Sequence, residues 1–217
     1  METTITILIY IHAFFGGIGL ITGIGSIVVT KGSPIHKKMG KLFTIGMLVS
    51  TLISIPVSCM PSHKNPFLLL IGLFTIYLVL AGNRALLFKT KTNANWKDKL
   101  ISGSMLFFSI IMLTLGLYKY IYNDILNILY FVFGSIGLLL TLNDFKFYKN
   151  PSQHKSGWIR SHIGKMVGAL IASITAFLVA GLSLSNLITW ILPSIIGTFY
   201  IIYWTRKMKS KAKSSKI

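Results

Sequence analysis

The ionisable side chains that could carry chemistry in this sequence are few, and most lie at the edges of long apolar runs. Imidazole and carboxylate groups bind metal ions, and guanidinium groups bind phosphate and carboxylate groups in a two-pronged geometry. The side chains of these types that we expect on one side of the protein are the candidates for a ligand or metal site: His36, Arg84, Asp144, His154, Arg160 and His162. Within this set, His36 and His162 are the predicted metal ligands.

Three hypotheses compete for these residues, and the sequence does not choose among them. In the first, His36 and His162 hold a b-type haem or another redox centre, since imidazoles from facing helices are common axial ligands. In the second, the same two histidines and His154 bind zinc, with Asp144 orienting a ligand or activating water, which would make a membrane-embedded hydrolase. In the third, the two arginines face phosphate or carboxylate groups in a small transporter, sensor or assembly factor without catalysis. Whether the protein is an enzyme stays open, and no catalytic residue is assigned.

The elements that must position these residues are membrane-spanning helices. A bilayer core about 30 Å thick needs about 20 apolar residues in a helix, because each backbone N–H and C=O must be satisfied within the segment. The chain is 53% hydrophobic and only 12% charged, which suits lipid contact. We predict an all-α integral membrane bundle of seven transmembrane helices in a single domain, 1–206, followed by a lysine-rich tail, 207–217. The seven apolar windows are 5–30, 42–60, 67–88, 100–118, 125–142, 163–183 and 187–205.

The placement of cations predicts the direction of every span. All of the 22 Lys and Arg residues except Lys64 and Lys119 lie in or at the edges of the first, third and fifth gaps or in and beside the tail. Positive residues are retained on the cytoplasmic side during insertion, so these gaps are expected there, with the N-terminus outside and the C-terminus in the cytoplasm. The six candidate residues then share one side of the membrane, where ionisable groups beside a span are candidates for function.

His12 does not join that group. It lies about 18 residues from the inner end of its span, which is about 27 Å at 1.5 Å per residue, so we expect a buried polar residue in the outer half. His12, Gly16, Gly19 and Gly23 recur at steps of four, three and four residues, which puts them on one stripe of the helix. Small residues of this kind allow close helix packing in lipid, so the stripe should face other helices. Ser33 is a plausible N-cap ahead of Pro34, which would start the second helix before the bilayer.

The net charge of +18 does not indicate a nucleic-acid binder. Such proteins gather their cations on one folded face, often among aromatic residues, whereas here they lie in short gaps between apolar runs. The expected partner is the lipid bilayer, with anionic lipid headgroups attracting the tail by about 1 kcal/mol for each basic residue near the surface. Cys59 is the single cysteine and has no partner for a disulfide.

Two segments resemble known sequences. The loop Lys31-Gly32-Ser33-Pro34-Ile35-His36-Lys37-Lys38-Met39-Gly40-Lys41 resembles the pattern K-G-x-x-H-R-x-x-G-R, and the stretch Trp158-Ile159-Arg160-Ser161-His162-Ile163-Gly164-Lys165-Met166 is similar to its companion block. Together with the closing Tyr203-Trp204-Thr205-Arg206, they resemble bacterial polytopic membrane proteins of unknown function. This resemblance implies a helical bundle in a bacterial plasma membrane and supplies no substrate.

Overall fold

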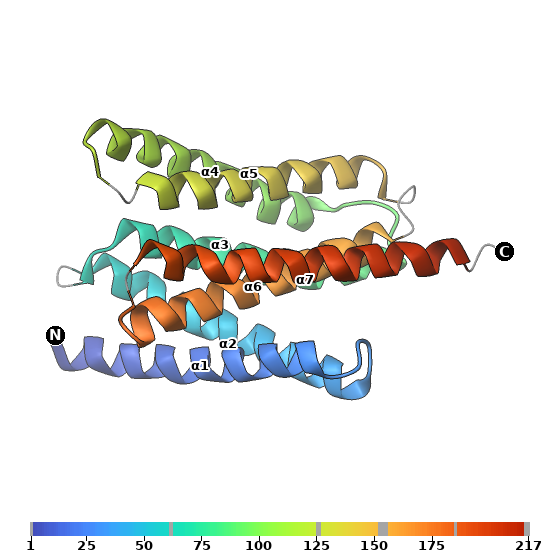
Figure 1. Ribbon diagram of the computed structural model, residues 1–217, viewed down its shortest axis with the longest axis horizontal. Helices are drawn as coiled ribbons and strands as arrows, with labels where there is room; N and C mark the ends of the chain where they lie inside the picture. The colour runs from blue at the N-terminus through green and yellow to red at the C-terminus, as the bar shows by residue number, and fades with distance from the viewer. Residues whose placement is uncertain (1, 61–62, 125–126, 152–155, 185, 215–217) are drawn as a thin grey trace.

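Seven helices long and apolar enough to cross a membrane make up most of the structure, as the sequence predicted. The computed structural model describes residues 2–60, 63–124, 127–151, 156–184 and 186–214, and all regular structure in these ranges is helical (Figure 1). A 3-10 turn, Leu86–Lys89, follows the third helix, and a π-helical turn, Phe177–Gly181, follows the sixth. The helices are α1 Glu2–Val28, α2 Pro34–Cys59, α3 Pro66–Ala85, α4 Trp96–Ile121, α5 Asn127–Lys149, α6 Gly157–Ala176 and α7 Leu187–Ser214.

Several helices extend beyond their apolar windows because their ends carry capping residues. The Ser33 side chain accepts a hydrogen bond of 3.1 Å from the His36 backbone N–H, and Pro34 opens α2, so the predicted early start of this helix is confirmed. In α4, Asn95 and Asp98 form a capping box, in which each side chain accepts from the other residue's backbone N–H. These extensions place polar residues just outside or at the edge of the apolar layer.

The helices form three tiers, which Figure 1 shows one above another. The hairpin of α1 and α2 forms one outer tier, and the hairpin of α4 and α5 forms the other. Between them, α3 packs against α6 and also contacts α2 and α4, while α7 packs mainly against α6. The most enclosed apolar side chains include Leu78 and Val79 of α3, which are 1% and 0% exposed. The α3–α6 pair is therefore the centre of the bundle.

Glycine brings α1 and α2 into backbone contact. A Cβ atom added at Gly46 would lie 2.8 Å from the Phe15 carbonyl oxygen and 2.9 Å from the Gly19 nitrogen, which is too close for any larger residue. A Cβ at Gly19 would lie 2.8 Å from the Met47 sulfur. The predicted stripe on the first helix therefore faces α2, and this prediction is confirmed.

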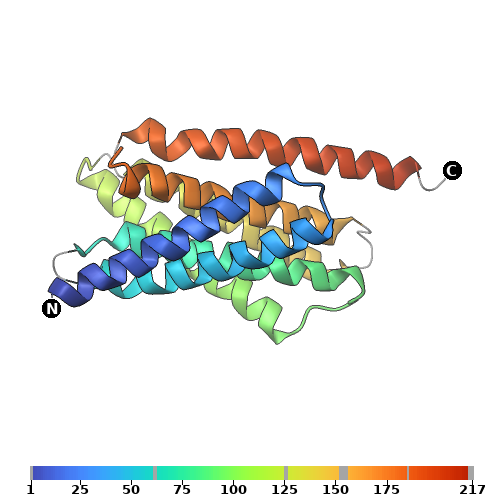
Figure 2. The same cartoon turned by 90° about the horizontal axis from the view of Figure 1, so that it is seen from below.

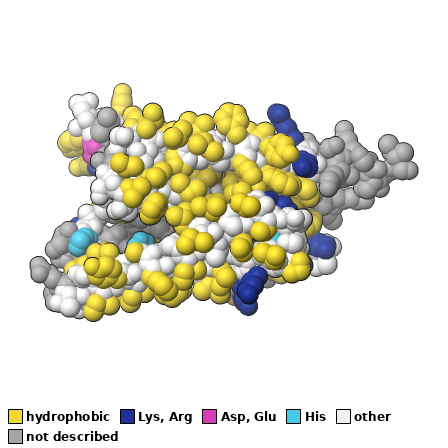
Figure 3. Space-filling model, turned by 60° about the horizontal axis from the view of Figure 1, so that its bottom comes forward, with side chains coloured by type: hydrophobic (Ala, Val, Ile, Leu, Met, Phe, Trp, Pro, Cys, Tyr) yellow, Lys and Arg dark blue, Asp and Glu magenta, His cyan; other side chains and the backbone are white. Residues whose placement is uncertain are grey.

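The two ends of the bundle differ in charge. The C-terminus lies at the end where α1 joins α2 and α3 joins α4, and the N-terminus lies at the opposite end (Figure 1). In the space-filling view, most of the visible Lys and Arg side chains gather toward the C-terminal end (Figure 3). We call this the basic end. Figure 2 shows α7 running along the edge of the bundle toward it.

Candidate functional site

A buried carboxylate joins four helices near the basic end. The Lys165 Nζ atom of α6 donates to Asp144 Oδ1 of α5 at 2.5 Å, and each of the two side chains is only 5% exposed. The other carboxylate oxygen, Oδ2, accepts from the Tyr77 hydroxyl of α3 at 2.8 Å and from Ser102 Oγ of α4 at 2.9 Å. Ser102 Oγ also lies 3.0 Å from the Tyr148 hydroxyl. Burial of an ion pair is tolerated when further hydrogen bonds satisfy the charge, and here three donors share the carboxylate.

Close packing of α3 and α6 holds Lys165 in this position. A Cβ atom added at Gly82 of α3 would lie 3.1 Å from the Lys165 Cβ atom and 2.9 Å from the Met166 sulfur. One helical turn before Lys165, the Ser161 hydroxyl accepts a second hydrogen bond from its Nζ atom at 2.6 Å. The ammonium group is therefore directed toward α5 and held between a carboxylate and a hydroxyl.

A cavity of about 440 Å³ opens between α5 and α6 beside this ion pair. Its volume falls in the range typical of small-molecule sites, about 300–1,000 Å³. Its charged lining consists of three cations and one acid, and the acid is already paired with one of the cations. The Nε atom of half-buried Arg160 is shielded from solvent and has no hydrogen-bond partner among the described residues. The polar and charged side chains of the lining are Asn143, Asp144, Lys146, Arg160, Ser161 and Lys165.

A second acid near the basic end ties α3 to the start of α4. The fully buried side chain of Asp98 accepts from Arg84 Nε at 2.6 Å and from Lys91 Nζ at 2.7 Å. The Arg84 Nη2 atom also donates to Asn95 Oδ1 at 3.0 Å. Arg84, which was predicted to face an anion, is thus bound to protein groups and is not among the residues that line the cavity.

The two histidines predicted as metal ligands are each fixed by a backbone carbonyl. The Nδ1 atom of His36 lies 3.1 Å from the Ser26 oxygen, and that of His162 lies 2.9 Å from the Gly82 oxygen. A carbonyl only accepts, so each Nδ1 atom carries the proton. Ser26 lies near the end of α1 and Gly82 near the end of α3, and both of these helices end at the basic end. His36 and His162 therefore share the basic end, on α2 and α6.

His12 belongs to a different part of the bundle. Its Nδ1 atom lies 2.9 Å from both the backbone oxygen and the hydroxyl of Ser50, and Ser50 Oγ donates to the His12 carbonyl at 3.0 Å. These bonds join α1 to α2 beside the glycine contact. His12 is accordingly a polar link within the helix pair.

The predicted candidates therefore fall into sets with different partners. Asp144 and Arg160 border the cavity, Arg84 belongs to the Asp98 group, and the two histidines are held by backbone carbonyls. His154 lies outside the described residues. Within the ranges that the structure describes, no group of three or more His, Cys, Asp and Glu side chains is arranged to hold a metal ion.

Several residues of these networks were not singled out from the sequence, among them Tyr77, Asp98, Ser102 and Lys165. One signal could have found Lys165, because it lies inside the predicted span 163–183 and an intramembrane lysine needs a partner. The whole chain has only four acidic residues, so very few side chains could be the partner of Lys165. Nothing local marks Tyr77 or Ser102, which are ordinary residues of apolar helices.

Comparison with known protein families, curated proteins and solved structures finds no match to this chain. The polytopic architecture stands on the seven helices themselves.

Proposed function

We propose that this chain is a multi-pass protein of a bacterial plasma membrane that binds a small phosphate or carboxylate anion in the cavity between α5 and α6. Its basic end would face the cytoplasm, since cation-rich gaps are retained there. The bacterial membrane follows from the resemblance of the 31–41 and 158–166 segments. Anion binding of this kind suits a small transporter or sensor, and it needs no catalytic residue.

The observation that carries the proposal is the buried Nε atom of Arg160, which has no hydrogen-bond partner among the described residues. A buried donor without an acceptor costs about 1–3 kcal/mol, so an isolated buried Nε–H calls for an explanation. Arg160 also lines an open cavity, and an oxyanion bound there would give its guanidinium group an acceptor once the side chain turns Nε toward the cavity. The planar guanidinium group binds phosphate and carboxylate oxygens in pairs, which makes it the natural recognition group.

The other charges of the cavity favour the same ligand. The negative charge of Asp144 is already paired with Lys165. Among the ion pairs of the described residues, none joins Arg160 or the exposed Lys146 to an acid. Ser161 and Asn143 add neutral hydrogen-bonding groups to the lining. A site with an excess of two cations attracts an anion, and the low-dielectric walls of the bundle strengthen that attraction.

The volume indicates more than a bare inorganic ion. About 440 Å³ is many times the space of one water molecule, which is about 30 Å³ in the liquid. An organic phosphate or a small carboxylic acid would use the charged groups and also contact the apolar part of the lining, Leu140 and Phe147. These are the ligand classes to test first.

The test measures anion binding to the purified protein in nanodiscs by isothermal titration calorimetry. Inorganic phosphate, acetate and glucose 6-phosphate serve as probes, and Arg160→Gln is expected to weaken the best of them at least tenfold. Lys37→Gln removes an exposed cation of α2 at the same end of the bundle instead and should leave binding unchanged. Absence of binding of all three probes, or equal binding by the two variants, would overturn the proposal.

A second candidate is favoured by the geometry of His36 and His162. Histidines that bind metals commonly donate one ring N–H to a backbone carbonyl, which leaves the other nitrogen available as a ligand. Haem b needs only two such axial nitrogens, whereas a zinc-dependent hydrolase would need further ligands. A Soret band that shifts on reduction and disappears in His162→Ala would support haem, and stoichiometric zinc lost in that variant would support the hydrolase. A colourless, metal-free preparation would remove this candidate.

A further inference from the structure

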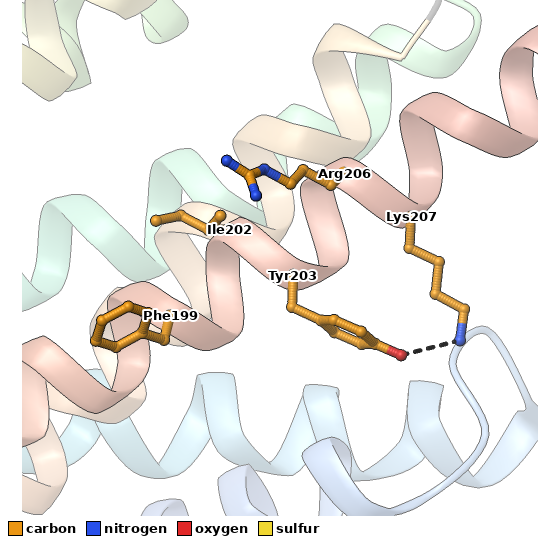
Figure 4. Close-up of a pocket in the computed structure, with 5 residues that line it drawn as sticks. All are labelled: Phe199, Ile202, Tyr203, Arg206 and Lys207. Carbon is orange, nitrogen blue, oxygen red and sulfur yellow. Dashed lines mark hydrogen bonds between the residues drawn. The ribbon is translucent and has the colours of Figure 1, made fainter.

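A groove of about 580 Å³ lies on the exposed face of α7 at the basic end, and none of its lining residues lines the cavity between α5 and α6. The residues that line it are spaced by three and four, so they form one stripe of the helix. Figure 4 shows Tyr203 and Lys207 directed from α7 toward α1 and the loop that follows it, with the Lys207 Nζ atom 3.4 Å from the Tyr203 hydroxyl. The lining residues are Phe199, Ile202, Tyr203, Arg206 and Lys207.

The stripe changes from apolar to cationic along the helix. Phe199, Ile202 and Tyr203 are 69%, 40% and 56% exposed, and the same outer face continues toward the middle of the bundle with Ile195 and Ile196. This order matches the two parts of a phospholipid, because acyl chains lie in the bilayer core and phosphates lie at its surface.

The cationic part of the groove has no acidic partner among the described residues. Among the described residues, the ion pairs of Asp98, Asp124 and Asp144 involve lysines and arginines of other helices, and none involves Arg206 or Lys207. Beside the groove, the Trp204 ring lies 5.2 Å from the Lys31 Nζ atom and 5.0 Å from that of Lys207. Two cations thus lie beside one aromatic ring at the basic end.

Lys31, which lies near Trp204, is bound to the end of α1. Its Nζ atom donates to the Ile27 carbonyl and, at 3.3 Å, to the Ser26 carbonyl, so it closes the end of α1. Partial burial lowers the pKa of this amino group below its ordinary value. Lys31 is therefore occupied by the protein, and Arg206 and Lys207 are the cations available to a ligand.

We propose that this groove holds one anionic phospholipid, with its phosphate between Arg206 and Lys207 and an acyl chain along Phe199 and Ile202. The inference is independent of anion binding in the cavity. A second copy of the chain is a poorer occupant, because a two-fold contact in a membrane places the same residues of both copies side by side. Four cations would then meet at a surface without acids.

The test uses Trp204 as a local reporter of lipid. A variant with Trp96, Trp158 and Trp190 replaced by Phe keeps this single tryptophan, and brominated acyl chains quench it on contact. Brominated phosphatidylglycerol is expected to quench at a lower mole fraction than brominated phosphatidylcholine. Arg206→Gln with Lys207→Gln should reduce that preference by about fivefold for each charge removed.

The matched control is Lys37→Gln with Lys38→Gln, which removes two exposed lysines from the same end of the bundle. It should retain the preference if the groove, and not the general charge of the surface, selects the lipid. Native mass spectrometry of the wild-type protein gives a second reading, in which one retained phosphatidylglycerol supports the proposal. Equal quenching by the two lipids, equal loss in both double variants, or a dimer without bound lipid would overturn it.

Discussion

The strongest prediction concerns the buried ion pair between Asp144 and Lys165. Asp144→Asn removes the negative charge and leaves the Lys165 ammonium group without compensation in a site where both side chains are 5% exposed. Removal of one partner of a buried pair typically costs 3–5 kcal/mol. We expect about 3 kcal/mol, at the low end of that range, because Lys165 borders an open cavity that water can enter.

The reverse change should cost less. Lys165→Met leaves the Asp144 carboxylate with two hydroxyl donors, Tyr77 at 2.8 Å and Ser102 at 2.9 Å, which still stabilise its charge. We expect a loss of about 2 kcal/mol from this variant. The double variant leaves no uncompensated charge, so it should also lose only about 2 kcal/mol, about 3 kcal/mol less than the sum of the single changes.

The assay is reversible unfolding of the purified protein in mixed micelles by sodium dodecyl sulfate, followed by circular dichroism. The matched control is the pair Lys119–Asp124 at the opposite end, whose side chains are 29% and 33% exposed. Asp124→Asn should change the free energy of unfolding by no more than about 1 kcal/mol. If the Asp144 and Lys165 changes were simply additive, the reasoning that the pair compensates itself would be refuted.

Three further predictions test the packing, a helix end and the topology. Gly46→Ala should destabilise the protein by about 1–3 kcal/mol, because its Cβ atom would meet the α1 backbone at 2.8 Å. Gly103→Ala, with open space around it, should be neutral or stabilising by up to about 1 kcal/mol. The same unfolding assay compares the two variants, and equal effects would contradict the close contact. Asn95→Ala should cost about 1 kcal/mol by removing the cap of α4, measured as a lower midpoint in that assay, and no loss would show that the cap is dispensable. Alkaline phosphatase fused after Ile217 should be inactive and the same enzyme inserted after Asn123 should be active, and the opposite pattern would reverse the proposed orientation.

The sequence predicted the helices well because lipid imposes a strong and local rule. Each span had to be a long apolar run, and the start of α2 followed from Ser33 and Pro34, two neighbours in the chain. The glycine stripe of α1 was also readable, because only its spacing mattered. In each case the signal lies within one helix.

The site was predicted only in part because it depends on which helices are neighbours. Asp144 and Arg160 were recognised as candidates, and both border the cavity. Lys165 was counted among the loop cations, and the partners from α3 and α4 could not be found without knowing that these helices pack beside α5 and α6. Adjacency of helices that are not consecutive in the chain, such as α3 and α6, is set by side-chain fit across the whole bundle, which no local pattern records.

The two outer tiers have a consequence for biosynthesis. Each is a pair of consecutive helices, so each can assemble as soon as its second helix leaves the ribosome. The central partner α6 arrives late and carries Lys165, whose entry into lipid alone would be penalised by at most about 2.5–3.5 kcal/mol, the cost at the centre of a span. Because Asp144 is translated earlier on α5, it can receive this lysine during membrane integration. A nascent chain halted before α6 would instead leave this carboxylate with only its two hydroxyl donors, Tyr77 and Ser102.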